Sequence, residues 1–235
     1  MTQGSNEIEW FRDLLRRSKD VEARDPSTVL AWLDQKRKAP AFEAHLVGLS
    51  DLASWYVEER TGDVHSDSGA FFSIQGVRVT SEGGLREVSS WDQPIFTQKE
   101  GGVLALIAKQ EGPEILFLLN AKAEPGNIGV FQLSPTVQAS WSNLNRAHKG
   151  KRPPFTEVVL GEVPSRLVYE SLHNEEGSRF WRKSNRNQIW LVDWSQTPLD
   201  YDPRSFVWAS LSQIKAMILL DNIVNPYVKT IVAPL

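Results

Sequence analysis

The chain has 235 residues, with 26 Lys or Arg against 29 Asp or Glu, which gives a formal net charge of −3. This balance argues against a protein that tracks nucleic-acid phosphates, because such proteins carry a basic excess. The chain has no cysteine, so disulfides, thiolate metal sites and thiol nucleophiles are excluded. We see neither a signal peptide nor an apolar run long enough to span a membrane, so we expect a cytoplasmic protein with no membrane partner.

The N-terminal part reads as helical. Apolar residues recur at helical spacing behind Asn6, a candidate N-cap, which predicts a helix that ends near Ser18. Asp25-Pro26-Ser27 predicts the start of a second helix, and residues 51–60 read as a third, short one. We therefore expect an N-terminal helical arm over residues 1–60 that packs on the rest of the chain and carries no chemistry.

Short β-like runs dominate residues 61–235. Two apolar runs, 103–108 and 115–119, are separated by a turn that contains Gly112-Pro113, which predicts a hairpin. Further strands are expected at residues 71–79, 129–133, 156–163, 189–192 and 206–207. Helices are expected at residues 164–172 and after the capping-box pattern Ser210-Leu-Ser-Gln213. The prediction is an α+β fold, a single domain with a central mixed or antiparallel sheet flanked by helices.

Polar residues of the types that carry catalysis follow the second hairpin strand. Lys122 and Glu124 stand at positions i and i+2, so they point to the same face if the strand continues, and Pro125-Gly126 then turns the chain. Strand ends are common places for sites. A solvated Lys–Glu pair at a strand end is the alternative, and the pattern does not decide between them.

A second polar segment runs from Phe180 to Gln188. Donors that suit a diphosphate are offered by Arg182, Lys183 and Arg186, interleaved with Asn185 and Asn187. Trp181 offers a ring on which a base stacks. An ordinary basic surface turn explains the same residues. The four histidines are scattered without metal-ligand spacing, so we expect no metal site.

These residues lie in an ordered series of runs that resembles the NDP-hexose 2,3-dehydratases of deoxysugar biosynthesis. The runs are Gly69–Phe72 with Gly76-Val77, Trp91–Pro94, Ala121–Asn127, Leu133–Gln138, Ser142-Asn143 with His148, Glu175–Gly177 with Phe180 and Lys183, Asn185–Asn187, Phe206 with Trp208, and Asn222–Asn225. They span roughly residues 60 to 230. The chain departs from the family pattern at Ala70, Asn120, Trp141 and His173-Asn174.

The resemblance implies a fold, a reaction and an assembly. Family members typically carry two tandem Nudix-like repeats, and this chain holds one, which predicts a 2,3-dehydratase-like domain over residues 61–235 and a homodimer. The Glu-rich Nudix helix that binds metal is absent, so pyrophosphate hydrolysis is not implied. The implied substrate is a dTDP-4-keto-6-deoxyhexose, dehydrated without a redox cofactor. The alternative is a non-catalytic sugar-nucleotide-binding protein or the partner of a catalytic chain.

The same resemblance suggests roles for single residues. Glu124 is the first candidate for the base that removes the C3 proton and His148 the second, while His148 is also a candidate acid for the leaving C2 hydroxyl. Lys122 or Asn127 would stabilise the enolate. The remaining candidates bind substrate: Asn143, Lys183, Asn185, Arg186 and Asn187 through polar contacts, with Trp141 or Trp181 as the stacking platform.

Overall fold

The computed structural model describes residues 3–18, 24–39, 42–69, 71–81, 88–144 and 152–235. They belong to two compact units. The main unit comprises Met1–Ala44, Gly102–Leu172 and Arg186–Leu235, and the small unit comprises His45–Gly101 and His173–Asn185. The expected domain boundary at residue 60 therefore lies inside the small unit.

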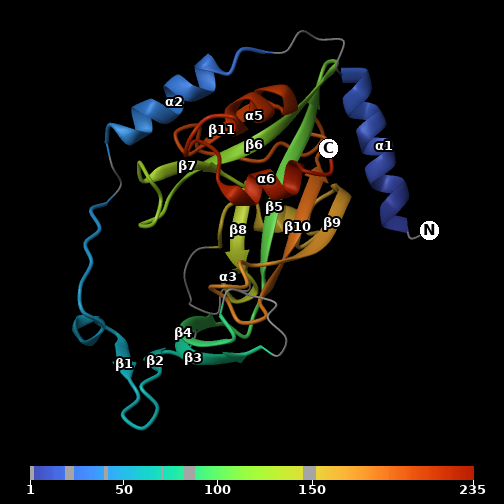
Figure 1. The fold of residues 1–235 in the computed structure, drawn as a ribbon. Coiled ribbons are helices and arrows are strands. Elements are labelled where there is room, and N and C mark those ends of the chain that lie inside the picture. The colour runs from blue at the N-terminus through green and yellow to red at the C-terminus, as the bar shows by residue number, and fades with distance from the viewer. Residues whose placement is uncertain (1–2, 19–23, 40–41, 70, 82–87, 145–151) are drawn as a thin grey trace. The chain divides into compact units, whose positions relative to one another are not determined.

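The main unit is built around one mixed sheet (Figure 1). Its strands are β5 (Gly102–Glu111), β6 (Glu114–Ala123), β7 (Phe131–Ser134), β8 (Val137–Ser140), β9 (Arg166–Asn174), β10 (Ser184–Leu191) and β11 (Phe206–Ser210). Hydrogen bonding gives the order β11-β6-β5-β10-β9, with β10 parallel to β5 and β6 antiparallel to both β5 and β11. The helices are α1 (Gln3–Ser18), α2 (Ser27–Arg37), α3 (Trp141–Leu144), α4 (Thr156–Val159), α5 (Leu211–Ile218) and α6 (Pro226–Val232). The predicted α+β class, with a mixed sheet and flanking helices, is confirmed.

The predicted hairpin forms and then divides. β5 and β6 pair from Glu111↔Glu114 to Ile107↔Leu118, and beyond that point β7 pairs with β6 while β8 pairs with β5. We call this arrangement the fork. Its closed end holds Thr136, whose buried hydroxyl accepts a hydrogen bond from the Ile107 amide at 2.9 Å and donates one to the Leu118 carbonyl. A single side chain thus satisfies one backbone group on each diverging strand.

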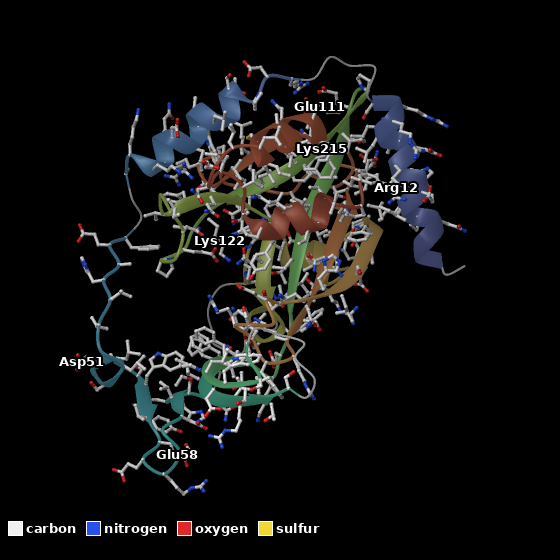
Figure 2. All side chains as sticks on the ribbon, viewed as in Figure 1. Arg12, Asp51, Glu58, Glu111, Lys122 and Lys215 are labelled. Carbon is white, nitrogen blue, oxygen red and sulfur yellow. The ribbon has the colours of Figure 1, made fainter. Side chains whose placement is uncertain are left out.

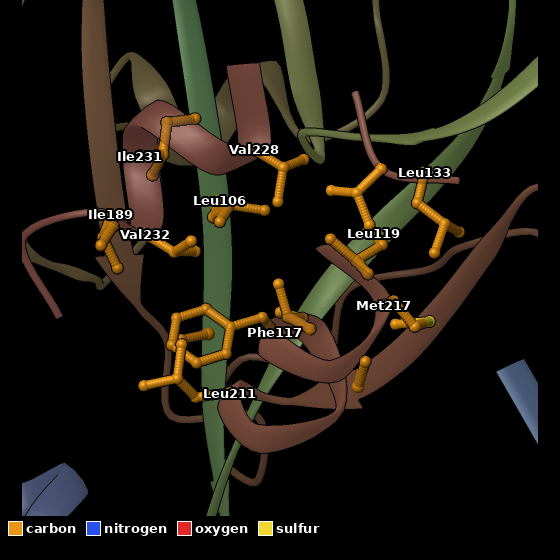
Figure 3. Close-up of a cluster of buried hydrophobic side chains, with 14 of the residues drawn as sticks. Leu106, Phe117, Leu119, Leu133, Ile189, Leu211, Met217, Val228, Ile231 and Val232 are labelled. Carbon is orange, nitrogen blue, oxygen red and sulfur yellow. The ribbon is translucent and has the colours of Figure 1, made fainter. Parts of the chain in front are cut away.

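Each face of the sheet carries its own hydrophobic cluster. On one face, side chains of β5, β6 and β10 pack against α5 and α6, as Figure 3 shows for Leu106, Phe117 and Ile189 with Met217 and Ile231. The other cluster is formed by Val103, Ala105, Ile107, Leu118, Val137, Ala139, Leu144, Phe155, Val158, Val159, Val192 and Phe206. Because both faces are covered, β5 and β6 are apolar almost throughout, and this explains why the sequence shows them so clearly.

The N-terminal helices are part of the main core. Phe11 of α1 meets Phe117 edge-on at 6.2 Å between ring centroids, and Leu33 of α2 is also fully buried. The Arg12 guanidinium donates to the Pro234 carbonyl at 2.7 Å, which ties α1 to the C-terminal segment. Helix α1 already includes Asn6, so the predicted N-cap is wrong, whereas α2 begins at the predicted Ser27.

The small unit holds a four-stranded antiparallel sheet. Its strands β1 (Trp55–Val57), β2 (Val64–Ser66), β3 (Ser73–Thr80) and β4 (Ser90–Thr97) are paired in that order. A chain of aromatic contacts runs from Trp55 through Phe72 and Phe96 to Phe180, with centroid distances of 5.1, 4.9 and 5.5 Å. Ring contacts therefore join the segment around Phe180 to this sheet.

Three predicted elements are wrong. Residues 51–60 contain strand β1 in place of a helix, because Trp55-Tyr56-Val57 pairs with β2 across a turn that Gly62 closes at a φ of +76°. Residues 156–163 begin with helix α4, where the Thr156 hydroxyl donates to the Pro153 carbonyl at 2.7 Å, and Gly161 at φ +71° follows the helix. Residues 166–174 form β9 in place of a helix, because pairing with β10 outweighs local periodicity. The predicted capping box of α5 at Ser210 is confirmed.

None of the described helices is long and apolar enough to cross a membrane.

Replacing Thr136 by valine should destabilise the fold strongly. Valine keeps the shape but leaves the Ile107 amide and the Leu118 carbonyl buried without their partner, which should cost about 2–4 kcal/mol of unfolding free energy. Urea denaturation of Thr136→Val measures this, and Thr136→Ser, which keeps the hydroxyl, should lose clearly less. Equal stabilities of the two variants would show that the hydroxyl does not hold the fork.

Candidate functional site

The open end of the fork carries the charged pair that the sequence predicted. Lys122 lies near the end of β6 and Glu124 directly follows the strand, and their Nζ and Oε1 atoms are 3.7 Å apart. The two side chains do share a face, as the i and i+2 spacing indicated. Both are about 30% exposed, so the pair is neither fully solvated nor sealed in the core.

Lys122 is a cation of this site with a shifted pKa. Its position is labelled in Figure 2. Burial lowers the pKa of Lys122 below the usual value, while the Glu124 charge and hydrogen bond act in the opposite direction. Burial has the larger effect. A lysine with a lowered pKa beside a carboxylate in a half-buried position is a combination that active sites use.

Gln138 completes the cluster from the opposite arm of the fork. Its Nε2 donates to Glu124 Oε1 at 2.9 Å, and its backbone carbonyl accepts from Lys122 Nζ at 3.4 Å. Residues from β6 and β8 thus meet across the gap between the strands. Gln138 is not among the predicted site residues, although it belongs to one of the matched runs and directly follows the buried Thr136 and Val137.

Asn127 supports the loop after β6. Its side-chain amide donates to the Lys122 carbonyl at 3.4 Å and to the Val130 carbonyl at 3.2 Å, and this closes the turn in which Gly129 and Val130 both have positive φ. These contacts fix the backbone that carries Lys122 and Glu124.

Two further predicted residues follow Gln138 in the chain. Trp141 and Asn143 lie in the short helix α3, directly after β8. The backbone N–H of Asn143 donates to Ser140 Oγ at 3.3 Å, and the Asn143 side chain is exposed. Trp141 is half-buried and packs against the hydrophobic cluster around Val137. His148 lies outside the described residues.

Three of the residues predicted for a diphosphate are neighbours on strand β10. Asn185 and Asn187 are buried and point to one face of β10, while Arg186 points to the other and pairs with Glu170 at 2.7 Å. Asn187 accepts from the Thr230 hydroxyl at 3.2 Å.

In the small unit, the other donors of this segment contact a carboxylate or an aromatic ring. Lys183 and Asn185 both contact Glu175 Oε1, at 3.6 and 2.6 Å. The Arg182 guanidinium lies 4.7 Å from the ring centroid of Trp181, which is 45% exposed. Trp181 thus already has a cation on its ring.

A group of carboxylates and one imidazole occurs in the small unit. Glu58, Asp63 and His65 each bring a potential metal-ligand atom within 4.8 Å of the others. Gln75 donates to Asp63 at 2.9 Å, and the His65 ring packs on Tyr56. Spacing alone did not predict this group, because the β1–β2 hairpin brings its members together.

Comparison with known proteins identifies the relatives of this chain. The family model described as NDP-hexose 2,3-dehydratase matches residues 26–235. A dTDP-4-dehydro-6-deoxy-alpha-D-glucopyranose 2,3-dehydratase of Saccharopolyspora spinosa is 37% identical over 203 residues, which are 86% of this chain and 40% of that protein. Proteins with the same name from Amycolatopsis orientalis and Streptomyces violaceoruber are 38% and 36% identical, over 84% and 87% of this chain and 42% and 45% of theirs.

The chain therefore spans less than half the length of these curated relatives. Among solved structures, a Nudix hydrolase from M. Smegmatis, RenU, matches with a TM-score of 0.32 and 15% identity over 64% of this chain and 87% of that one.

The fork cluster predicts how Lys122 titrates. Replacing Glu124 by Gln removes the charge that opposes burial, so the pKa of Lys122 should fall further. The measurement is NMR titration of the protein whose lysines carry ¹³C-methyl groups. Glu111→Gln, the same change at an exposed glutamate beside Lys109 at the far end of β5, is the matched control and should leave the Lys122 pKa in place. A Lys122 pKa that rises or stays unchanged in Glu124→Gln would contradict this electrostatic account.

Proposed function

The chain belongs to the NDP-hexose 2,3-dehydratase family, and we propose that it removes water across C2 and C3 of a nucleoside-diphosphate 4-keto-6-deoxyhexose. The observation that carries the proposal is the Lys122–Glu124–Gln138 cluster, which places a carboxylate beside a half-buried cation within the matched region. The dTDP sugar in the names of the three relatives is the substrate we expect.

The reaction needs a base and a stabiliser of negative charge. The C3 hydrogen is α to the C4 ketone, so a base can take that proton while the C3–H electrons form an enolate over C3, C4 and the ketone oxygen. The electrons then return to restore the ketone, a C2=C3 double bond forms, and the C2–O bond breaks. The leaving hydroxide takes a proton and departs as water. No electron is gained or lost, so the proposed mechanism uses no redox cofactor.

We assign the base to Glu124 and the stabilising cation to Lys122. The two groups are close enough to act on one substrate carbon and its neighbouring oxygen, and a half-buried cation interacts with an enolate more strongly than a solvated one. The Asn127 amide already donates to backbone carbonyls, which favours Lys122 for this role. His148 remains the predicted alternative base or the acid.

For the nucleotide we propose Arg186 and Asn143, whose side chains reach solvent in the main unit. Arg186 would exchange Glu170 for a phosphate oxygen, which suits its planar guanidinium. Lys183, Asn185 and Asn187 are engaged in the contacts described above. Stacking on Trp141 or Trp181 stays a prediction, as does a location in the cytoplasm.

We also propose that the chain self-associates. The resemblance implies two repeats in family members, and the curated relatives are more than twice as long as their matched segments. A homodimer would bring two such units together. Sedimentation of the purified chain should show a dimer, and a strictly monomeric profile at all concentrations would contradict it.

The activity is tested by incubating the chain with dTDP-4-keto-6-deoxyglucose in deuterated water. Loss of the C2 hydroxyl, followed by NMR and mass spectrometry, is the expected result. Deuterium at C3 without elimination would point to epimerisation instead. Binding of dTDP without exchange or elimination would support the sugar-nucleotide-binding alternative, and absence of binding would contradict both.

Glu124→Gln should abolish most of the turnover. Removing a positioned general base costs about 10²- to 10⁴-fold in rate, so kcat should fall by at least about 100-fold. Glu111→Gln again serves as the control for loss of one surface carboxylate and should keep the wild-type rate. A Glu124→Gln enzyme with unchanged turnover would exclude Glu124 as the base.

A further inference from the structure

Gln138 makes an unusual set of contacts for a residue in a core strand. Its Nε2 is bound to Glu124 and its carbonyl to Lys122, yet its side-chain oxygen Oε1 is buried and, in the part of the chain that the structure describes, has no hydrogen-bond partner. Half of the amide is therefore satisfied by the candidate base and half is unsatisfied.

Glu124 determines the orientation of this amide. In the reversed orientation, Gln138 Oε1 would face Glu124 Oε1, and two acceptors would meet at 2.9 Å. The observed orientation gives the carboxylate a donor and leaves the amide oxygen without one. The hydrogen bond to Glu124 therefore decides the orientation, although this orientation leaves the amide oxygen without a donor.

The fold itself does not require an amide at this position. The neighbouring Val137 and Ala139 supply the side chains that β8 contributes to the hydrophobic cluster, and the backbone of Gln138 pairs with Leu104 of β5. A buried acceptor without a donor is destabilising, and an apolar side chain of the same length would avoid that cost. The amide thus contributes a contact to Glu124 at the expense of local stability.

We propose that Gln138 is a positioning residue that holds the Glu124 carboxylate for proton transfer, an inference that rests on the proposed function. Gln138 Nε2 and Lys122 Nζ both approach Oε1 of Glu124, at 2.9 and 3.7 Å. Because both contacts occupy Oε1, the other carboxylate oxygen, Oε2, is the one that accepts the C3 proton. In this step the C3–H bond breaks, its electrons enter the enolate and the proton joins Oε2.

Holding the carboxylate in advance has a kinetic consequence. A glutamate at a strand end has three rotatable side-chain bonds, and a base acts only when it is within hydrogen-bond reach of the proton. A misplacement of about 1 Å can cost roughly 10²-fold in rate. Because Gln138 contacts the base, its loss should affect kcat more than KM.

The test is Gln138→Met, which keeps the length of the side chain and removes both the donor and the unsatisfied acceptor. We expect kcat to fall about 10- to 100-fold with KM within about twofold, and the urea midpoint to stay equal or rise. Gln75→Met is the matched control, since Gln75 also donates to a carboxylate, that of Asp63 at 2.9 Å in the small unit, and it should keep the wild-type kcat. A wild-type kcat in Gln138→Met, or a lowered urea midpoint that accounts for its lost activity, would overturn the proposal.

A second readout does not depend on activity. ¹³C relaxation of the Glu124 side chain should show greater motion in Gln138→Met than in the wild type, and Gln138→Asn, whose shorter amide reaches less far, should show the same change. An unchanged Glu124 order parameter in these variants would refute the positioning role. If the wild-type chain does not dehydrate the sugar but Glu124 becomes mobile in Gln138→Met, the proposed function fails while the positioning contact stands.

Discussion

The main unit depends on one side chain at the point where its central hairpin divides. β5 and β6 part beyond Ile107↔Leu118, and two diverging strands in a core would leave backbone donors and acceptors without partners. The Thr136 hydroxyl serves one group on each strand, and β7 and β8 pair with the strands beyond it. This double pairing lets a sheet with two covered faces open without losing its hydrogen bonds.

The opening allows charged groups inside an otherwise apolar sheet. Lys122 reaches from β6 toward the carbonyl of Gln138 on β8, and Glu124 accepts the Gln138 amide from the same gap. Beyond the dividing point β6 pairs with β7 and β5 pairs with β8, so these contacts between the β6 and β8 segments are made by side chains and not by the backbone ladder of β5 and β6. The lowered pKa of Lys122 and the unsatisfied oxygen of Gln138 are two energetic costs of the same arrangement, and both involve residues that contact Glu124.

The sequence predicts secondary structure best where local patterns and tertiary structure agree. The 103–119 hairpin, the start of α2 and the capping box of α5 were predicted because apolar runs, turn residues and caps act over a few neighbouring residues. For residues 156–174 the predicted order, a strand followed by a helix, is the reverse of the observed order, helix α4 followed by strand β9. The pairing of β9 with β10 decides between them, and that partner lies outside the segment whose local pattern was read.

The sequence by itself determined the α+β class and the family. It also determined that Lys122 and Glu124 share a face, because a two-residue spacing on a strand fixes the direction of both side chains. Tertiary structure alone decided the rest of the cluster. Gln138 meets Glu124 only because β7 and β8 return along the two arms of the fork. Contacts between strands depend on how the chain returns, and spacing along the chain does not encode that.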